Sequence, residues 1–165
     1  MESVGAEIES RNILPCTALP KSADATAIQN LVAAYFQRTD RPGIDPVSEL
    51  FAQAGTLALG NMVITGRASI ALFFEERNLS QSAVQRVTRH MSGGIELTAM
   101  DADRVAGRST ALVFAGEGQC PLPTGAPSTI CDFDDIYVRT SGGWLFEERR
   151  ATVIFTGAGA AAFAK

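Results

Sequence analysis

The side chain best suited to proton transfer in this sequence is His90, the only histidine among the 165 residues. Imidazole changes its charge near neutral pH, so acid–base chemistry in this chain would run through it. The stretch 85–91 reads as a β-strand, in which alternate side chains share a face, and this places Arg86, Thr88 and His90 together. A histidine that only packs in the fold would show the same local pattern, so its spatial neighbours must decide its role.

Three aspartates, Asp132, Asp134 and Asp135, are of the type that could hold a metal ion or form a paired-carboxylate site. Strand alternation puts Asp132 and Asp134 on one face and Asp135 on the other. No second cluster of histidine or cysteine accompanies them. We therefore predict no metal site and no cofactor.

Composition excludes several classes of partner. The formal net charge is −4 and basic residues do not cluster, so a nucleic-acid partner is not expected. The apolar runs are far shorter than the ~20 residues that span a bilayer, so no membrane contact is expected. The three cysteines lack metal-ligand spacing, and nothing resembles a signal peptide, which together predict a reducing, cytoplasmic setting.

The elements that must position these residues form one domain by length. Residues 1–22 contain two prolines and little periodicity, and we expect an irregular N-terminal arm. The domain proper is expected over residues 23–156. Residues 157–165 form a Gly/Ala-rich C-terminal tail.

Three helices are predicted in the first half of the domain. Apolar residues at i, i+3, i+4 and i+7 from Ile28 to Tyr35 predict a helix over about 24–39, with Asp24 as its N-cap. Asp40 then lies at its C-terminal end, either as a turn residue or as a base at the mouth of a cavity. A short second helix is expected from Pro46 to about 54, and a third from 66 to about 78.

The second half changes to strand periodicity. Two short strands, 56–59 and 62–65, precede the third helix, and four long ones follow at 85–98, 104–116, 129–140 and 144–155. Connections of hairpin length make most of them antiparallel, and Gly93-Gly94 inside the first long strand predicts a bulge that bends the sheet. The fold class is therefore α+β, with helices packed into the concave side of a curved, mainly antiparallel sheet.

Several short motifs now gain meaning together. These are Ile28-Gln29-Asn30-Leu31 with Tyr35 and Asp40, Glu49-Leu50-Phe51-Ala52, Thr65-Gly66-Arg67-Ala68-Ser69-Ile70, Arg89-His90, Asp134-Asp135-Ile136-Tyr137-Val138-Arg139, and Gly143-Trp144 with Arg149. In this order and spacing they resemble the SnoaL-like branch of the nuclear transport factor 2 superfamily, over about residues 23–155. The resemblance implies a cone-shaped, cystatin-like α+β barrel with a deep apolar pocket.

The resemblance also implies site residues. Asp40 and His90 fall where the dehydratases and a dehydrochlorinase of this superfamily keep a paired aspartate and histidine, and Arg149 matches an arginine near the leaving group. A carboxylate that orients an imidazole leaves its other ring nitrogen free to remove a proton from carbon. Tyr35 stands where the dehydrochlorinase has a lysine, and a second histidine found in scytalone dehydratase is missing here.

From these residues we predict a lyase or isomerase without cofactor, acting by dehydratase-type elimination or proton shuttling on a hydrophobic cyclic small molecule. The residues expected to bind that molecule are Tyr35, Phe36, Phe51, Met62, Phe73 and Phe74. Two alternatives stay open: a polyketide-cyclase-like enzyme, and a non-catalytic ligand-binding or assembly module such as a ring-hydroxylating dioxygenase small subunit. Valine and isoleucine beside charges on the outer sheet face predict a homo-oligomer, a dimer or a trimer.

Overall fold

The computed structural model describes residues 18–158 and residue 160 of the chain. Most of the predicted arm and most of the predicted tail therefore lie outside the described residues. The elements in chain order are α1 (Ser22–Asp40), the 3-10 helix η1 (Val47–Leu50), β1 (Phe51–Leu59), β2 (Met62–Thr65), α2 (Arg67–Ala83), β3 (Arg86–Ala99), β4 (Arg104–Glu117), β5 (Thr129–Thr140) and β6 (Gly143–Thr156).

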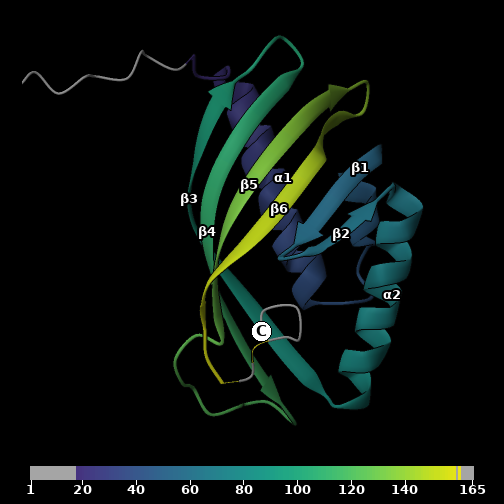
Figure 1. Cartoon of the computed structure of the whole chain (residues 1–165), viewed down its shortest axis with the longest axis vertical. Helices are drawn as coiled ribbons and strands as arrows, with labels where there is room; N and C mark the ends of the chain where they lie inside the picture. Colours follow the sequence, from purple (N-terminus) through teal and green to yellow (C-terminus); the bar gives the residue numbers. More distant parts are fainter. Residues whose placement is uncertain (1–17, 159, 161–165) are drawn as a thin grey trace, which may run out of the picture.

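All six strands belong to one strongly curved sheet, ordered β2-β1-β6-β5-β4-β3 (Figure 1). Every neighbouring pair is antiparallel except β1 and β6, which run parallel. Helix α1 crosses the concave face, where it contacts β3 and β6, while α2 contacts both edge strands, β2 and β3. One helix can reach both edges only because the sheet curls around it, which confirms the predicted α+β architecture.

The bend in β3 lies where the sequence predicted it. The pairing of β3 with β4 shifts register between Ser92 and Ile95, so Gly93 and Gly94 form the irregularity. The first part of β3 therefore lies against the C-terminal end of α1 and the last turns of α2. The second part continues along the sheet. This change of direction brings His90 over the concave side of the sheet.

Two of the helix predictions need correction. The second helix is only one 3-10 turn, and β1 begins at Phe51. Phe51 and residues 56–59 pair with β6, and that pairing outweighs the helical pattern of Val47, Leu50 and Phe51. Asp24 is also not an N-cap. Helix α1 begins at Ser22 after Lys21, and the Asp24 carboxylate instead binds Arg139 and the indole N–H of Trp144 across to β5 and β6.

The third predicted helix is correct but longer than expected, since α2 continues to Ala83 rather than ending near Asn78. Strands β1 and β2 form a hairpin that turns at Gly60-Asn61, and Gly60 takes a positive φ of 58° there. The extra turns of α2 extend beyond β1 and β2, opposite the first half of β3 (Figure 1). They form one wall of the cavity described below.

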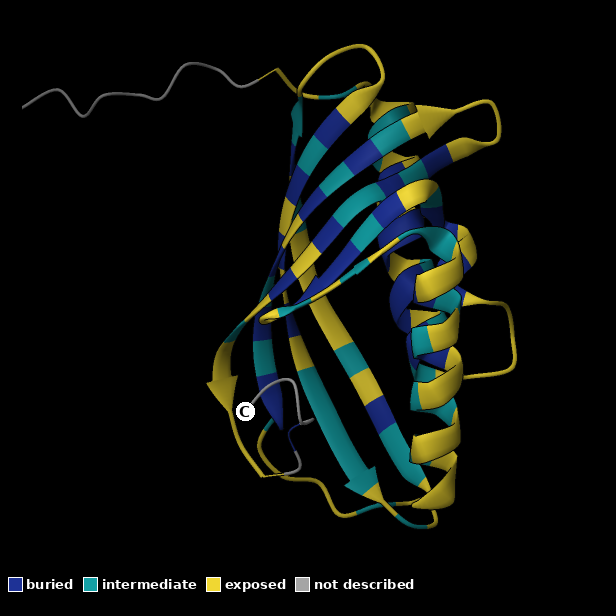
Figure 2. Ribbon diagram, turned by 45° about the vertical axis from the view of Figure 1, so that its right-hand side comes forward, coloured by how far each residue is buried: buried dark blue, intermediate teal, exposed yellow. Residues whose placement is uncertain are grey.

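The hydrophobic core lies between α1 and the concave face of the sheet (Figure 2). The predicted stripe of α1 is buried in full, from Ile28 through Tyr35, and Phe36 and Thr39 extend it. By contrast, the outer side of α2 is exposed along its length (Figure 2). Within the described residues, no helix is both long enough and apolar enough to cross a bilayer.

Candidate active site

His90 and Asp40 meet where the end of α1 faces the first half of β3. The His90 Nδ1 lies 2.6 Å from Asp40 Oδ1, and the His90 backbone N–H donates to Oδ2 at 2.7 Å. The Thr88 hydroxyl donates to Oδ1 at 2.8 Å. Both side chains are largely buried, with 13% of His90 and 7% of Asp40 exposed. The carboxylate is therefore held at both oxygens by the strand that carries the histidine.

These contacts fix the ionisation of Asp40. Burial alone would favour the neutral acid, but the hydrogen bonds and charge of His90 and the hydroxyl of Thr88 outweigh it and lower the pKa of Asp40. An ionised carboxylate only accepts hydrogen bonds, so Nδ1 carries the proton and donates it. The ring of Phe36 stacks on the imidazole, with centroids 5.1 Å apart and planes inclined by 20°. The imidazole thus has one defined tautomer and one orientation, and its Nε2 makes no hydrogen bond to any described residue.

His90 borders a cavity of about 430 Å³ between α2 and the concave face of the sheet. Its apolar walls include Tyr35, Leu59, Phe73, Phe74, Val84, Val113, Cys131, Phe133 and Ala151. Its polar lining comprises Thr39, Arg77, Ser80, Gln81, Arg86, Thr88, His90, Glu117, Ser128 and Thr129. A volume of this size is within the usual range of small-molecule sites.

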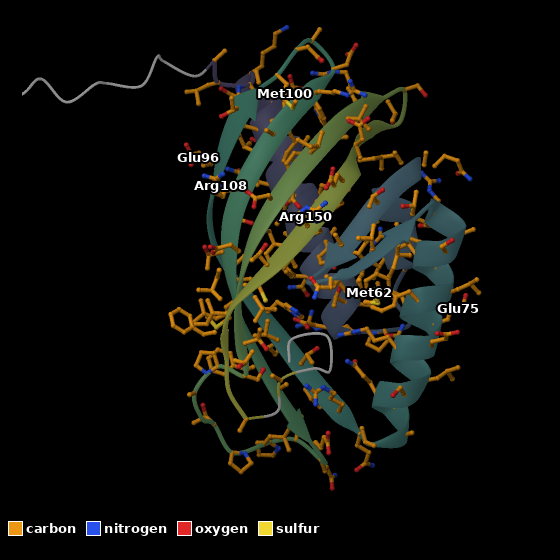
Figure 3. The ribbon with its side chains drawn as sticks, viewed as in Figure 1. Met62, Glu75, Glu96, Met100, Arg108 and Arg150 are labelled. Carbon is orange, nitrogen blue, oxygen red and sulfur yellow. The ribbon has the colours of Figure 1, made fainter. Side chains whose placement is uncertain are left out.

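The structure divides the six residues predicted to bind substrate. Tyr35, Phe73 and Phe74 line the cavity. Phe36 lies behind His90 and Phe51 is fully buried in the core, so neither borders the cavity. Met62 lies on β2 beside α2, packed against the core and away from the cavity lining (Figure 3). The aromatic residues that line the cavity and those that are buried in the core show the same periodicity. The sequence pattern therefore does not distinguish the two groups.

Arg149 is fully buried and does not border the cavity. Its guanidinium pairs with Asp135, its cross-strand neighbour, at 3.3 Å, and Tyr137 donates to the same carboxylate oxygen at 2.8 Å. It also lies 4.1 Å from the ring centroid of Tyr35 and 4.2 Å from that of Phe133. Since those two rings line the cavity, Arg149 lies one aromatic layer behind it and does not reach the Asp40–His90 pair.

Two residues of the site escaped the sequence reasoning. Thr88 was placed on the face of His90, but its bond to Asp40 was not foreseen. Arg77 follows Ile70, Phe73 and Phe74 at helical spacing in the sequence, and that spacing alone assigns it no role in the site. The sequence signal for Arg77 is a basic residue on the apolar stripe of a helix. A charged side chain is rarely buried unless it has a polar partner.

Other reactive groups near the cavity do not fit a nucleophile or a metal centre. Cys131 is a free cysteine that lines the cavity, and burial raises the pKa of its thiol to about 11, so the thiolate is scarce at neutral pH. The predicted separation of the aspartates is observed: Asp135 points inward, while Asp132 and Asp134 are bound on the outer face by Thr110 and Arg108. No group of three or more metal-binding side chains gathers within the described part of the chain.

On the outer face of the sheet, two rows of side chains run across the strands, one charged and one apolar. In one row, register places Glu96, Arg108, Asp134 and Arg150 side by side with alternating charge (Figure 3). In the other, Met91, Leu112, Ile130 and Phe155 are neighbours across β3, β4, β5 and β6. Met91 and Phe155 are 62% and 63% exposed, which makes this an apolar strip on the surface.

Comparison with known proteins gives the fold a family. A sequence model described as a SnoaL-like domain matches residues 20–150. A search of curated proteins finds no match.

Three solved structures illustrate the similarity of fold. A candidate scytalone dehydratase from Novosphingobium aromaticivorans is 19% identical with a TM-score of 0.70, covering 84% of this chain and 89% of that one. An NTF2-like protein with a cystatin-like fold from the same organism is 24% identical with a TM-score of 0.66, covering 87% and 90%. A candidate aromatic ring hydroxylase, also from that organism, is 20% identical with a TM-score of 0.67, covering 87% and 97%.

Proposed function

The chain belongs to the SnoaL-like domain family, and we propose that it is a lyase or isomerase that moves a proton on a hydrophobic cyclic molecule without a cofactor. One observation carries the proposal. A histidine whose Nδ1 is bound to an ionised aspartate borders a cavity that is lined by both aromatic and polar side chains, and its Nε2 has no hydrogen-bond partner among the described residues. This is the arrangement that a general base on carbon requires.

In this mechanism His90 Nε2 removes the proton and Asp40 is its positioning partner. Asp40 accepts the Nδ1 proton, holds the tautomer and stabilises the imidazolium that forms. General base catalysis of this type typically contributes ~10²–10⁴-fold in rate. The imidazolium can then return the proton, either to another carbon, which gives isomerisation, or to a leaving oxygen, which gives elimination.

The walls of the cavity support a hydrophobic ring compound as substrate. Tyr35, Phe73, Phe74 and Phe133 present aromatic surface toward the same space as His90. The structural relative that is a candidate scytalone dehydratase favours elimination among the reactions open to such a site. Arg149 acts in this proposal through the rings of Tyr35 and Phe133, which it holds in place from behind.

The coupling of Asp40 to His90 can be tested without any substrate. Because His90 is the only histidine, the NMR signals of its two ring nitrogens are unambiguous. We expect the Nδ1-protonated tautomer in the wild type and a change of tautomer in Asp40→Asn, since the carboxylate accepts the Nδ1 proton. Asp45→Asn removes an exposed carboxylate of the same charge and should leave the tautomer unchanged.

On any substrate that the protein converts, Asp40→Asn should lower kcat by at least ~10²-fold, because the amide does not hold the imidazole as a charged carboxylate does. Identical signals of the His90 ring nitrogens in the two proteins would contradict the coupling. Unchanged ligand affinity with no pH-dependent rate would instead favour a binding module.

The apolar strip on the outer face supports a separate proposal about assembly. We propose that a second copy of the chain covers Met91, Leu112, Ile130 and Phe155, so that the protein is a homo-oligomer. Sedimentation velocity should then show a species larger than the 17.5 kDa chain, and Phe155→Asp should shift it toward the monomer. A wild type that sediments as a monomer at micromolar concentration would contradict this.

A further inference from the structure

Arg77 brings a positive charge to the cavity without a carboxylate partner among the described residues. Its Nη1 donates to the carbonyl oxygen of Thr39 at 3.2 Å and lies 3.4 Å from Asn78 Oδ1. Its Nε and Nη2 make no hydrogen bond to any described residue. The guanidinium carbon lies 5.9 Å from the ring centroid of Phe74, another wall of the cavity.

The surroundings of Arg77 make it a poor structural cation and a good ligand for an anion. Burial lowers the pKa of Arg77, and the nearby charge of Arg86 acts in the same direction, while Tyr35 and Asp40 oppose them. The carboxylate of Asp40 is already occupied by His90 and Thr88. A partly desolvated guanidinium with free donors gains most from an oxyanion that can accept two of its N–H groups at once.

We propose that Arg77 binds a negatively charged oxygen of the substrate, so the substrate is a hydrophobic ring compound that carries a carboxylate or forms an enolate in the reaction. The inference rests on the proposed function in taking this cavity as the substrate site. Arg77 and His90 line the same cavity, so one molecule can meet both residues. The Tyr35 ring lies in the same lining, and its hydroxyl makes no hydrogen bond to any described residue.

In the enolate case His90 acts as the base and Arg77 binds the oxygen that becomes charged. His90 Nε2 takes the proton from the carbon next to a carbonyl group, and the electron pair of that C–H bond becomes a carbon–carbon double bond. The π electrons of the carbonyl move to its oxygen, which becomes the oxyanion held by Arg77. Stabilising charge that appears only in the transition state and intermediate raises the rate of the chemical step.

Binding of small aromatic probes tests the proposal. Isothermal titration calorimetry would compare 2-naphthoate with its neutral analogue 2-naphthamide on the wild type, Arg77→Gln and Arg41→Gln. We expect the wild type to bind the carboxylate about tenfold or more tighter than the amide, because a hydrogen bond to a charged group is worth that much. Arg77→Gln should remove this preference, and Arg41→Gln, which deletes an exposed arginine next to Asp40, should retain it.

A second arm distinguishes the two sources of the anion. The near-ultraviolet absorption of 2-naphthol reports its ground-state ionisation, and an enolate-binding Arg77 should make bound naphthol ionise at lower pH in the wild type than in Arg77→Gln. Preference for naphthoate alone assigns Arg77 to a substrate carboxylate, and an effect on naphthol assigns it to an enolate oxygen. Equal binding of naphthoate and naphthamide together with unchanged naphthol ionisation would overturn the proposal.

Two further variants keep the result unambiguous. His90→Ala should keep the naphthoate preference, and loss of the preference in His90→Ala but not in Arg77→Gln would place the anion on the histidine and overturn the assignment. If Arg77→Gln does not fold, the preference for naphthoate over naphthamide is compared between the wild type and Arg77→Lys instead. None of these measurements needs His90 to remove a proton from carbon, so they stand or fall separately from the NMR test of the Asp40–His90 coupling.

Discussion

Two carboxylates, each paired with a nitrogen-bearing side chain, lie next to the Phe36 ring. The imidazole of His90, paired with Asp40, stacks on Phe36 with centroids 5.1 Å apart. The guanidinium of Arg149, paired with Asp135, lies 5.0 Å from the same ring centroid. Both pairs join neighbouring elements of the concave side, yet only the first borders the cavity.

The two carboxylates differ in how their charge is satisfied. Asp40 has partners at both oxygens, and its pKa is lowered despite burial. Asp135 Oδ1 has no hydrogen-bond partner among the described residues, and burial raises the pKa of Asp135 against the attraction of Arg149. Arg149 Nε and Nη2 are likewise without partners there and face aromatic rings.

The difference separates a structural pair from a reactive one. Arg149 and Asp135 are enclosed on all sides, so neither can exchange a proton with a bound molecule, and their charge stabilises only each other. His90 keeps one ring nitrogen at the cavity while the other is fixed. Access to the cavity, rather than the presence of a buried ion pair, therefore identifies the candidate catalytic residues in this fold.

The largest expected effect on stability comes from breaking the enclosed pair. Arg149→Met should lower the free energy of unfolding by about 3 kcal/mol or more, because it leaves the Asp135 carboxyl buried without its counter-charge. Urea denaturation measures this. Arg150→Met, at the next position of β6 and on the outer face, is the matched control and should change stability by only about 0.5 kcal/mol.

The double variant Arg149→Met with Asp135→Leu sharpens the test. Replacing both members of a buried pair by apolar residues of similar size removes the unpaired charge, so this protein should recover much of the loss. If Arg149→Met were as stable as the wild type while kcat collapsed, Arg149 would belong with His90 as a functional residue, and the comparison above would fail.

The sequence predicted the fold well where its pattern reflects the backbone itself. The long strands and the bulge at Gly93-Gly94 follow from alternation and from glycine, and α1 follows from its apolar stripe. The predicted second helix was wrong beyond Leu50, because β1 begins at Phe51, which pairs with Phe146 of β6, far along the chain. Such a long-range pairing leaves no local mark in the sequence around Phe51.

The candidate site was predicted less evenly. His90 stood out as the only histidine, and its pairing with Asp40 came from the resemblance; the two side chains do meet. The same resemblance gave no sign that Arg149 would lie behind an aromatic layer. The choice between wall and core for Phe36, Phe51 and Phe73 depends on which side of each element faces the cavity. That depends on how α2 crosses the edges of the curled sheet, which no periodicity encodes.

A smaller effect should distinguish the reactive pair. Asp40→Asn should cost about 1 kcal/mol of stability at pH 7, since the site can retain part of its hydrogen bonding through the amide. The folded state lowers the pKa of Asp40 below its ordinary value of 3.8, so the unfolded chain takes up a proton first as the pH falls. The stability that ionised Asp40 contributes is therefore fully present above that value and is lost as the pH drops through the lowered pKa.

Urea unfolding of the wild type and Asp40→Asn at a series of pH values from 7 to about 2.5 would measure this contribution. The stability difference between the two proteins should shrink below about pH 4, because only the wild type has the carboxylate to protonate. Asp45→Asn, which removes an exposed carboxylate, should follow the wild type closely. A difference that persists unchanged at pH 2.5 would mean that the charge of Asp40 adds nothing to the fold, so that Asp40 holds the imidazole by geometry alone.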